Sequence, residues 1–460
     1  MVSGSKKSGK TKSKANEMAI SCINPNAAGI DVGSDRHYVA VGADRADKCV
    51  QSFGCYTPDL EEMAKWLTEC GITRVAMEST GVYWIPVHQV LTEHGLDVNL
   101  VDARHVKNVP GRKTDVLDCQ WIQQLHSYGL LRGCFLPPAE IAVLREYWRH
   151  RGSLVESVSR EILHMQKSLE QMNVQLHKAI TDITGVTGMR IIRAIVAGER
   201  NAAVLAGMRD PGVKKTEEEI RKALSGFYQE EHLFTLRQAL ELYDILHAKI
   251  EECDAKIEQC LQGFENKADP KSYVPGPSKP KTRRKNQPHF DLDRELYRIT
   301  GVDLTAIEGI EGLTAQVVIS EVGFDLSAFP TEEHFTSWLH LCPNNRITGG
   351  KIKRRGTQKS ENRLANALRL GAQSLHSSKS ALGAFYRRIR ATHGGPKAIT
   401  ATARKLACLI YRMLRYGMNY VSEGQQKYEQ RFQEQQHKYL QKKAAALGYQ
   451  LMCVQTGEVS

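Results

Sequence analysis

Residues 113–118 read Lys-Thr-Asp-Val-Leu-Asp, and the N-terminal part of the chain is best understood outward from this stretch. Asp115 and Asp118 are three residues apart, so on a helix they project from one face, one turn above the other. Two carboxylates this close repel each other, whereas a divalent cation reverses the sign, because Mg²⁺ prefers oxygen ligands. Taken alone, the pair is more readily explained as a solvated acidic turn. A metal site therefore requires carboxylates from elsewhere in the fold.

Two such carboxylates lie in stretches that have the pattern of buried strands. Residues 28–43 contain an apolar entry, a Gly-Ser turn and then alternating apolar residues, which predicts two strands joined by a tight turn, with Asp31 inside the first. Residues 74–80 predict another short strand that ends near Glu78, and residues 97–102 predict one more. An acid in an apolar strand is unfavourable unless it is paired or bound to metal. Asp31 and Glu78 are therefore candidate ligands.

Helical patterns separate these strands. Apolar residues at helical spacing predict one helix over residues 59–70, with a turn at Thr57-Pro58 just before it, and a second helix over residues 84–91. Pro137-Pro138 closes this region. Residues 26–136 are therefore predicted to form an α/β domain.

A strand Asp, a strand Glu and a helical Asp-x-x-Asp resemble the Asp-Glu-Asp-Asp core of the ribonuclease H-like, RuvC-like nucleases. The motifs Gly-Ile-Asp-Val-Gly, Glu-Ser-Thr-Gly-Val-Tyr-Trp, Val-Asp-Ala-Arg-His-Val-Lys and Lys-Thr-Asp-Val-Leu-Asp follow one another from Gly29, Glu78, Val101 and Lys113. In this order they look like the transposases of insertion-sequence family one hundred and ten, the bridge-RNA-guided recombinases. The resemblance resumes late in the chain and covers most of it.

This resemblance implies an active site, a cofactor and partners. It implies that Asp31, Glu78, Asp115 and Asp118 hold Mg²⁺, as two ions roughly 3.5–4 Å apart that serve the attacking and the leaving oxygen. It also implies that active sites are assembled from two protomers, in a homodimer or homotetramer. A structured guide RNA would select the double-stranded DNA at the element ends and the target by base pairing, which leaves the protein to read shape and backbone.

Composition and charge favour a cytosolic protein with an anionic partner, and the resemblance implies the cytoplasm of a bacterium or archaeon and association with the nucleoid. The 460 residues carry a net charge of +12, which favours an anionic partner. Eleven cysteines without a Cys-x-x-Cys pair indicate a reduced chain without a zinc site. No apolar run approaches the length of a membrane span. The lysine-rich residues 1–25 predict a disordered basic arm rather than a signal peptide.

Residues 137–265 are predicted to form a helical coiled-coil region with an inserted helical segment. A long helix over 139–180 and a second helical run over 246–260 both carry apolar residues at alternating steps of three and four. These two stripes pack on each other either within one chain or between chains, and we favour some subunit pairing. Residues 266–292, rich in proline and with a Lys-Arg run, predict a flexible basic linker.

The pattern Ile-x-Gly-apolar-x-Gly-apolar occurs twice, from Ile183 and from Ile307. A Gly-rich hairpin before a helix presents free N–H groups to a phosphate. The second copy, with Gly309 and Gly312, looks like the helix-hairpin-helix of DNA-binding proteins. A plain helix turn explains the second copy equally well and explains the first copy better.

Residues 293–422 are predicted to form a mostly α-helical DNA-binding domain, followed by a helical tail over 423–460. No acidic residue occurs between Glu361 and Glu423, whereas a solvated face usually mixes both signs, so this interval indicates a polyanionic partner. Its tyrosines could stack on bases, although core packing explains each of them as well. The expected nucleic-acid contacts are Gly309, Gly312, Lys351, Lys353, Arg354, Arg355, Arg363, Arg387, Arg388, Arg390, Lys397 and Arg404.

A candidate nucleophile lies in a loop rich in glycine and basic residues. Thr348 precedes Gly-Gly-Lys, and the family that the chain resembles has a serine in this place, in a Ser-Gly-Gly-Lys loop, that joins covalently to DNA. The branched Cβ makes threonine a more hindered nucleophile, but it keeps the hydroxyl that the chemistry requires. Ser360 is the nearby alternative. Without the resemblance, Thr348 would be an ordinary loop threonine.

Together with the resemblance, these patterns predict a DNA transposase or recombinase that excises and integrates an insertion sequence by strand cleavage and exchange. Guidance by RNA is what the resemblance implies. Two alternatives remain open. The first is a metal-dependent RuvC-like endonuclease or junction resolvase, in which water attacks and Thr348 only binds phosphate. The second is a non-catalytic nucleic-acid-binding scaffold whose carboxylates serve folding.

Overall fold

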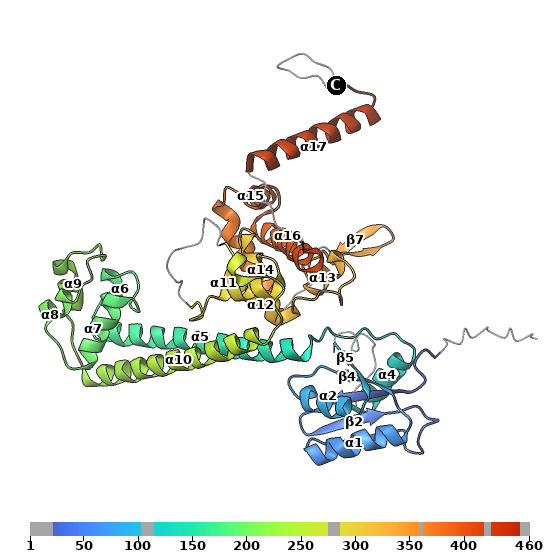
Figure 1. Cartoon of the computed structure of the whole chain (residues 1–460). Helices are drawn as coiled ribbons and strands as arrows, with labels where there is room; N and C mark the ends of the chain where they lie inside the picture. The colour runs from blue at the N-terminus through green and yellow to red at the C-terminus, as the bar shows by residue number, and fades with distance from the viewer. Residues whose placement is uncertain are drawn as a thin grey trace, which may run out of the picture. The chain divides into compact units, whose positions relative to one another are not determined.

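The computed structural model describes residues 22–102, 115–274, 286–354, 356–357, 362–417 and 425–450. The chain divides into two compact units, 1–136 and 137–460, which are described separately (Figure 1). The first is α/β and the second is mostly helical, as the sequence predicts. Most of the predicted basic arm and the Lys-Arg run of the predicted linker lie outside the described residues.

The first unit contains a mixed five-stranded sheet in the order β3-β2-β1-β4-β5. β1 (Ala27–Val32) and β2 (Arg36–Ala40) form the predicted antiparallel pair, and β3 (Val50–Gly54) pairs antiparallel with β2. β4 (Arg74–Glu78) and β5 (Asp97–Val101) both follow the direction of β1. This order and these directions are consistent with a RuvC-like fold. β3 was not predicted from the sequence.

Helices cover both faces of this sheet. α1 (Thr57–Glu69) and α2 (Trp84–Glu93) share an apolar core with one face, which includes Ile30 and Met77. On the opposite face, α4 (Asp115–Ser127) contributes Ile122 to a smaller cluster with Ala76 and Val101. Burying apolar side chains against both faces is what stabilises the parallel part of the sheet.

The second unit begins with two long helices, α5 (Ala139–Gln171) and α10 (Glu230–Gln262), which lie side by side (Figure 1). They run antiparallel, because the Arg151 side chain contacts Asp254 while the Ser168 hydroxyl lies 2.9 Å from that of Thr235. The predicted stripes therefore pack within one chain, and coiled-coil geometry remains a prediction. The first helix ends earlier than predicted, at a turn in which Asn173 has a left-handed φ of 56°.

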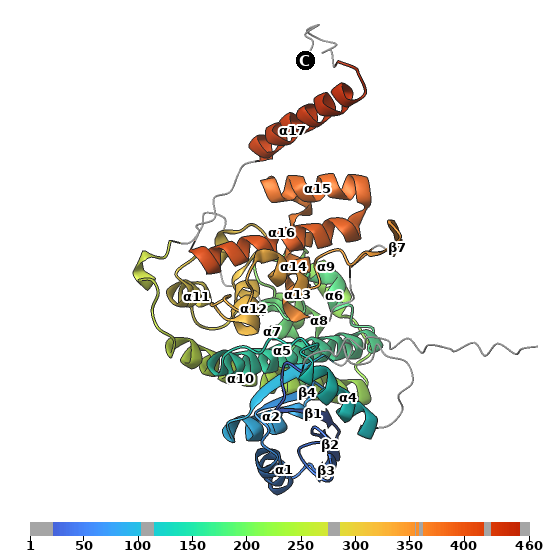
Figure 2. The ribbon, with the colours of Figure 1, turned by 90° about the vertical axis from the view of Figure 1, so that its right-hand side faces the viewer.

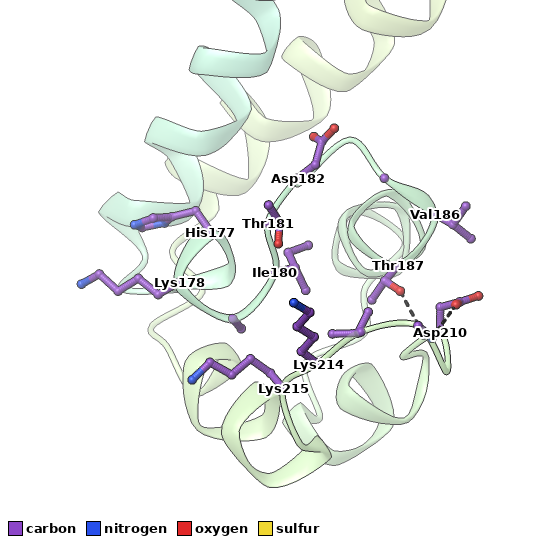
Figure 3. Close-up of a pocket in the computed structure, with 14 residues that line it drawn as sticks. His177, Lys178, Ile180, Thr181, Asp182, Val186, Thr187, Asp210, Lys214 and Lys215 are labelled. Carbon is purple, nitrogen blue, oxygen red and sulfur yellow. Dashed lines mark hydrogen bonds between the residues drawn. The ribbon is translucent and has the colours of Figure 1, made fainter. Parts of the chain in front are cut away.

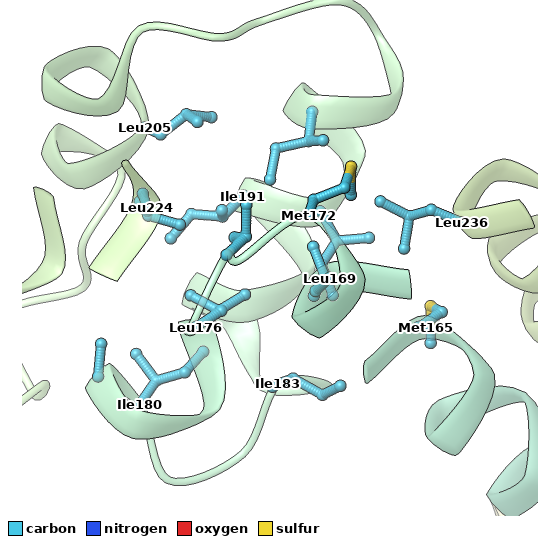
Figure 4. Close-up of a cluster of buried hydrophobic side chains, with 14 of the residues drawn as sticks. Met165, Leu169, Met172, Leu176, Ile180, Ile183, Ile191, Leu205, Leu224 and Leu236 are labelled. Atoms are coloured by element: carbon cyan, nitrogen blue, oxygen red, sulfur yellow. The ribbon is translucent and has the colours of Figure 1, made fainter. Parts of the chain in front are cut away.

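The segment between these helices forms a small helical tip with its own core. It contains α6 (Leu176–Ala179), α7 (Val186–Val196), α8 (Ala202–Gly207) and α9 (Glu217–Leu224). Figure 4 shows apolar side chains from this segment meeting others from both long helices, among them Met165, Leu169, Met172, Ile191, Leu205, Leu224 and Leu236.

The rest of the second unit is a helical assembly with one small hairpin. Within it, α15 and α16 pack side by side (Figure 2). Its elements are the 3₁₀ turns η1 (Pro270–Ser272), η2 (Leu304–Ala306) and η3 (Leu375–Ser377), the strands β6 (Arg346–Thr348) and β7 (Lys351–Arg354), and the helices α11 (Leu292–Thr300), α12 (Gly312–Val322), α13 (Glu332–Trp338), α14 (Arg363–Ser374), α15 (Ala381–His393), α16 (Gly395–Tyr416) and α17 (Gln425–Ala446).

α12 is fixed to α5 by charged side chains. Arg149 donates two hydrogen bonds to the carboxylate of Glu321, at 2.7 and 3.0 Å, and Arg145 donates to the Glu321 carbonyl at 2.5 Å. Among the helices of the described part of the chain, none combines the length and the hydropathy that crossing a membrane requires.

The buried ion pair of Arg151 and Asp254 joins α5 to α10, and its contribution to stability can be tested by mutation. Asp254 is 1% exposed and Arg151 4% exposed, and the guanidinium also donates to the Asn286 carbonyl at 2.9 Å. Asp254→Asn should leave a buried guanidinium without its counter-charge and destabilise the protein by about 3–5 kcal/mol. Chemical denaturation measures this loss. Glu218→Gln, which breaks the exposed pair with Arg221, is the control and should leave the denaturation midpoint in place. Equal, small effects in both variants would contradict the prediction.

Candidate active site

Asp31 and Glu78 come from neighbouring parallel strands. The preceding residues, Ile30 on β1 and Met77 on β4, are partners in the sheet register. Consecutive side chains on a strand point to opposite faces of the sheet. Asp31 and Glu78 therefore both lie on the face opposite to Ile30 and Met77. The two carboxylates therefore lie at equivalent positions, at the carboxyl ends of adjacent strands.

The face that they share is the one covered by α4. Val101 of β5 is the register partner of Glu78 and packs with Ile122 of α4. Partners on parallel strands share a face, so Glu78 belongs to the α4 side of the sheet. Asp31 lies on this side too, because it is two residues from Gly29, whose Cα is in close contact with α4: a Cβ there would overlap the backbone of Cys119.

The direction of α4 brings its first turn to these strand ends. Near the end of α4, the Ser127 carbonyl accepts hydrogen bonds from the N–H groups of Ile23 and Asn24, ahead of β1. One turn earlier, the Gln123 side chain donates to the Ala27 carbonyl at 3.3 Å. α4 therefore runs antiparallel to β1. Its first turn, which begins at Asp115, lies beside the carboxyl end of β1.

The carboxylates differ in exposure and share an electrostatic neighbourhood. Glu78 is 7% exposed and accepts a hydrogen bond from the Thr80 hydroxyl at 3.1 Å, whereas Asp31 and Asp118 are half-buried. Burial, followed by the negative charges of Asp31 and Asp118, raises the pKa of the Cys119 thiol to about 12. Both carboxylates therefore act on one buried thiol in α4. The side chain of Asp115 lies outside the described residues.

The donor set suits a hard cation in its chemistry. Carboxylate oxygens, such as those at the carboxyl ends of β1 and β4, are the ligands that Mg²⁺ prefers. In the side-chain positions of the described residues, however, no three His, Cys, Asp or Glu side chains form a group that could hold a metal. The side chain of Asp115, the fourth expected ligand, is not among the side chains to which this applies.

Thr348 lies in a β-hairpin, where the sequence predicted a loop. It is the last residue of β6 and pairs with Lys351 of β7. The two residues between them, Gly349 and Gly350, have φ values of 55° and 74°, the left-handed values that a two-residue hairpin turn requires. Thr348, Lys351 and Lys353 are exposed, so the hydroxyl lies beside a glycine turn and two lysines. Arg355, Ser360 and the side chain of Arg354 lie outside the described residues.

Several cations of the acid-free interval are used within the chain. The Arg387 guanidinium donates to the Ser378 carbonyl at 2.6 Å, and Arg412 makes two hydrogen bonds to Glu332, at 2.7 and 2.8 Å. Glu332, which lies outside the interval, pairs with Arg412, so a segment without acids of its own is not a segment of unpaired cations, and the inference of a polyanionic partner is weaker. Arg404 is half-buried and Arg388 lies among aromatic rings, whereas Arg363, Arg390 and Lys397 are exposed.

The glycines of the second Gly-rich motif have a packing role in the fold. Gly309 has a φ of 90°, and a Cβ there would lie 2.8 Å from the Gly371 carbonyl oxygen of α14. Gly312 begins α12 against the carboxylate of Asp293. Close backbone packing therefore explains both glycines, and contact with DNA remains a prediction.

The exposed cations give a test of nucleic-acid contact. Replacing Arg363, Arg390 and Lys397 together by Ala should reduce the slope of log affinity against log salt by up to about three, because fewer phosphate counterions are released. Arg412→Ala is the control, since its guanidinium is held by Glu332. Fluorescence anisotropy with labelled duplex DNA over a salt series measures both slopes. An unchanged slope in the triple variant would exclude these side chains from the interface.

A separate hollow lies in the helical tip and was not anticipated from the sequence. It has a volume of about 690 Å³ between α6, the start of α7 and the loop after α8 (Figure 3). Three lysines line it, Lys178, Lys214 and Lys215, together with Asp182 and Asp210. The acidic side chains offset much of the lysine charge, and Lys215 is paired with Glu219 at 2.7 Å.

Comparisons with known proteins agree with both ends of this architecture. Residues 28–174 match a family model described as "Transposase", and residues 303–387 match one described as "Transposase IS116/IS110/IS902 family". A relative from Streptomyces coelicolor, "Insertion element IS110 uncharacterized 43.6 kDa protein", is 32% identical over 123 residues. That match spans 26% of this chain and 30% of the relative's length. The chain therefore carries IS110-family transposase domains, one that covers the α/β unit and continues into α5 and one in its C-terminal helical region.

Proposed function

We propose that the protein is a DNA transposase or recombinase that excises and integrates an insertion sequence by strand cleavage and exchange. The observation that carries this proposal is that Asp31, Glu78 and the first turn of α4 lie together at the carboxyl ends of β1 and β4. The strand order brings residues that are far apart in sequence close together. The matches to transposase families support DNA strand cleavage and exchange as the reaction of this site.

In this proposal Asp31, Glu78, Asp115 and Asp118 hold Mg²⁺, with two ions per site. Bound there, the cations would polarise the scissile phosphate and stabilise the charge that develops on it. The chain's own contribution is to keep four carboxylates together despite their repulsion. Glu78 is fixed by burial and by the Thr80 hydroxyl, while Asp31 and Asp118 are half-buried.

Thr348 would supply the attacking hydroxyl. Its oxygen forms a bond to phosphorus, the bond from phosphorus to the 3′ oxygen breaks, and that oxygen leaves as a 3′-hydroxyl after taking up a proton. The proton of the threonine hydroxyl passes to solvent. The reverse reaction, with the 3′-hydroxyl of the exchanged strand as nucleophile, reseals the DNA and frees the threonine.

The proposed partners are double-stranded DNA at the element ends and target, a structured guide RNA, and further copies of the chain in a homodimer or homotetramer. The exposed cations Arg363, Arg390 and Lys397 support an anionic partner. Guidance by RNA follows from the family resemblance, and the direct test is whether a defined RNA copurifies with the protein.

An excision assay tests the function as a whole. A plasmid carries the gene with its native flanking DNA, and amplification across the joined flanks detects precise removal of the element. We expect a joined product and an excised circle with the wild-type gene. Linear products without joints would instead support the endonuclease alternative, which the branched Thr348 keeps open. No cleavage or joining at all, with DNA binding intact, would leave the non-catalytic scaffold.

A further inference from the structure

A cation–aromatic cluster joins α15, α16 and α17. The Arg388 guanidinium of α15 lies 4.0 Å from the ring centre of Phe432 and 5.5 Å from that of Tyr428, both on α17. The Lys405 amine of α16 lies 5.4 Å from the Tyr428 ring and 4.8 Å from that of Phe385 on α15. Two cations of the acid-free interval, of which Arg388 is an expected nucleic-acid contact, therefore face aromatic rings of the C-terminal helix.

The contact with α17 includes an unfavourable feature. The Tyr428 hydroxyl is buried and has no hydrogen-bond partner in the described part of the chain. A buried hydroxyl without a partner opposes docking, whereas each cation–aromatic contact favours it only modestly. Docking of α17 is thus expected to be weak, so that a ligand which replaces its rings and satisfies the cations can displace it.

The surface beneath α17 has the chemistry of a site for unpaired nucleotides. Nucleobases stack on arginine planes and on aromatic rings, while a neighbouring lysine binds the phosphate. Arg388 and Phe385 provide the stacking partners and Lys405 provides the ammonium group. In the free chain, the Phe432 ring is placed over Arg388 much as a base would be.

We propose that Phe385, Arg388 and Lys405 bind unpaired nucleotides of RNA or DNA, and that α17 competes with them for this surface by docking Tyr428 and Phe432. This rests on the proposed function, because it assumes a nucleic-acid partner. It assigns α17 the role of a replaceable cover whose aromatic rings stand in for bases.

Two substitutions in the full chain should change its affinity for single-stranded nucleic acid in opposite directions. Phe432→Ala removes the closest ring and should tighten binding of a labelled single-stranded oligonucleotide by roughly three- to tenfold, because more of the protein is in the open state. Tyr428→Phe keeps the ring and removes the unpaired hydroxyl, so it should strengthen docking and weaken binding. Tyr439→Ala, an exposed ring further along α17, is the control and should change neither.

Fluorescence anisotropy with single-stranded RNA, single-stranded DNA and duplex DNA of equal length identifies the source of the nucleotides. The opposite shifts should appear with single strands and be absent with the duplex. Unchanged or weaker single-strand binding in Phe432→Ala overturns the competition, as do equal shifts in the control. If the wild-type chain binds none of the three, the proposed function fails, which is distinct from binding that the α17 variants leave unchanged.

Discussion

Glu78→Gln should abolish strand cleavage and leave the fold intact. The substitution keeps the shape of the side chain and an oxygen that can accept the hydrogen bond from Thr80, so the buried position stays filled. It removes the negative charge on which cation binding depends, and a loss of roughly 10²- to 10³-fold or more in cleavage rate is expected. The excision assay and cleavage of its DNA in vitro measure this loss. Glu62→Gln, at an exposed position of α1, is the matched control and should cleave normally.

Thermal unfolding separates a metal role from a structural one. In the wild type, Mg²⁺ that binds only the folded state should raise the melting temperature as its concentration rises. In Glu78→Gln this rise should be lost, while the melting temperature without Mg²⁺ should be equal or higher, because one of several neighbouring negative charges has been removed. Normal cleavage by Glu78→Gln, or an undiminished Mg²⁺ effect, would refute the carboxylate site. A melting temperature that falls without metal would point to a folding role.

The parts of the fold that sequence could predict are those set by local periodicity. Short apolar runs identified the strands that carry Asp31 and Glu78, and alternation of apolar residues identified β2. Helical spacing identified α1 and α2. β3 (Val50–Gly54) was missed because it is a short edge strand with one buried residue, Phe53, and hence no alternation to detect. The hairpin at Thr348 could have been anticipated, since Gly-Gly between strands is a signal for a two-residue turn.

The parts that sequence could not predict depend on contacts between distant residues. The direction of α4 is set by hydrogen bonds from Ile23 and Asn24 to Ser127, about a hundred positions along the chain. The acid-free interval indicated a polyanionic partner, yet Glu332, 80 residues away in sequence, holds Arg412 of this interval. The rings of α17 lie on Arg388 through contacts that no local pattern records. The number of charges in a segment can therefore be read from the sequence, whereas the tertiary structure decides which of these side chains can contact a nucleic acid.

Thr348→Val should eliminate the covalent protein–DNA adduct, and Thr348→Ser should retain it. Valine keeps the branched Cβ that suits the end of β6, so the hairpin is preserved while the attacking oxygen is lost. Cleavage should fall on the order of 10³-fold or more if this hydroxyl is the nucleophile. Serine removes the hindering methyl group and should react at least as fast as threonine. A nicked suicide DNA that traps the cleaved state, run on a denaturing gel, shows the adduct as labelled DNA that migrates with protein.

The same gel decides between the hydroxyl and water as nucleophile. Thr357→Val is the matched control, because it removes an exposed hydroxyl nine residues beyond Thr348 and should leave the adduct unchanged. If Thr348→Val cleaves as fast as the wild type and no variant forms an adduct, water is the nucleophile and the endonuclease alternative holds. If Thr348→Val loses both adduct and cleavage while its affinity for DNA is unchanged, phosphate binding alone cannot be the role of Thr348. Recovery of the adduct in Thr348→Ser then assigns the chemistry to the hydroxyl itself, because the two variants are identical except that serine has a hydroxyl group at this position and valine has none.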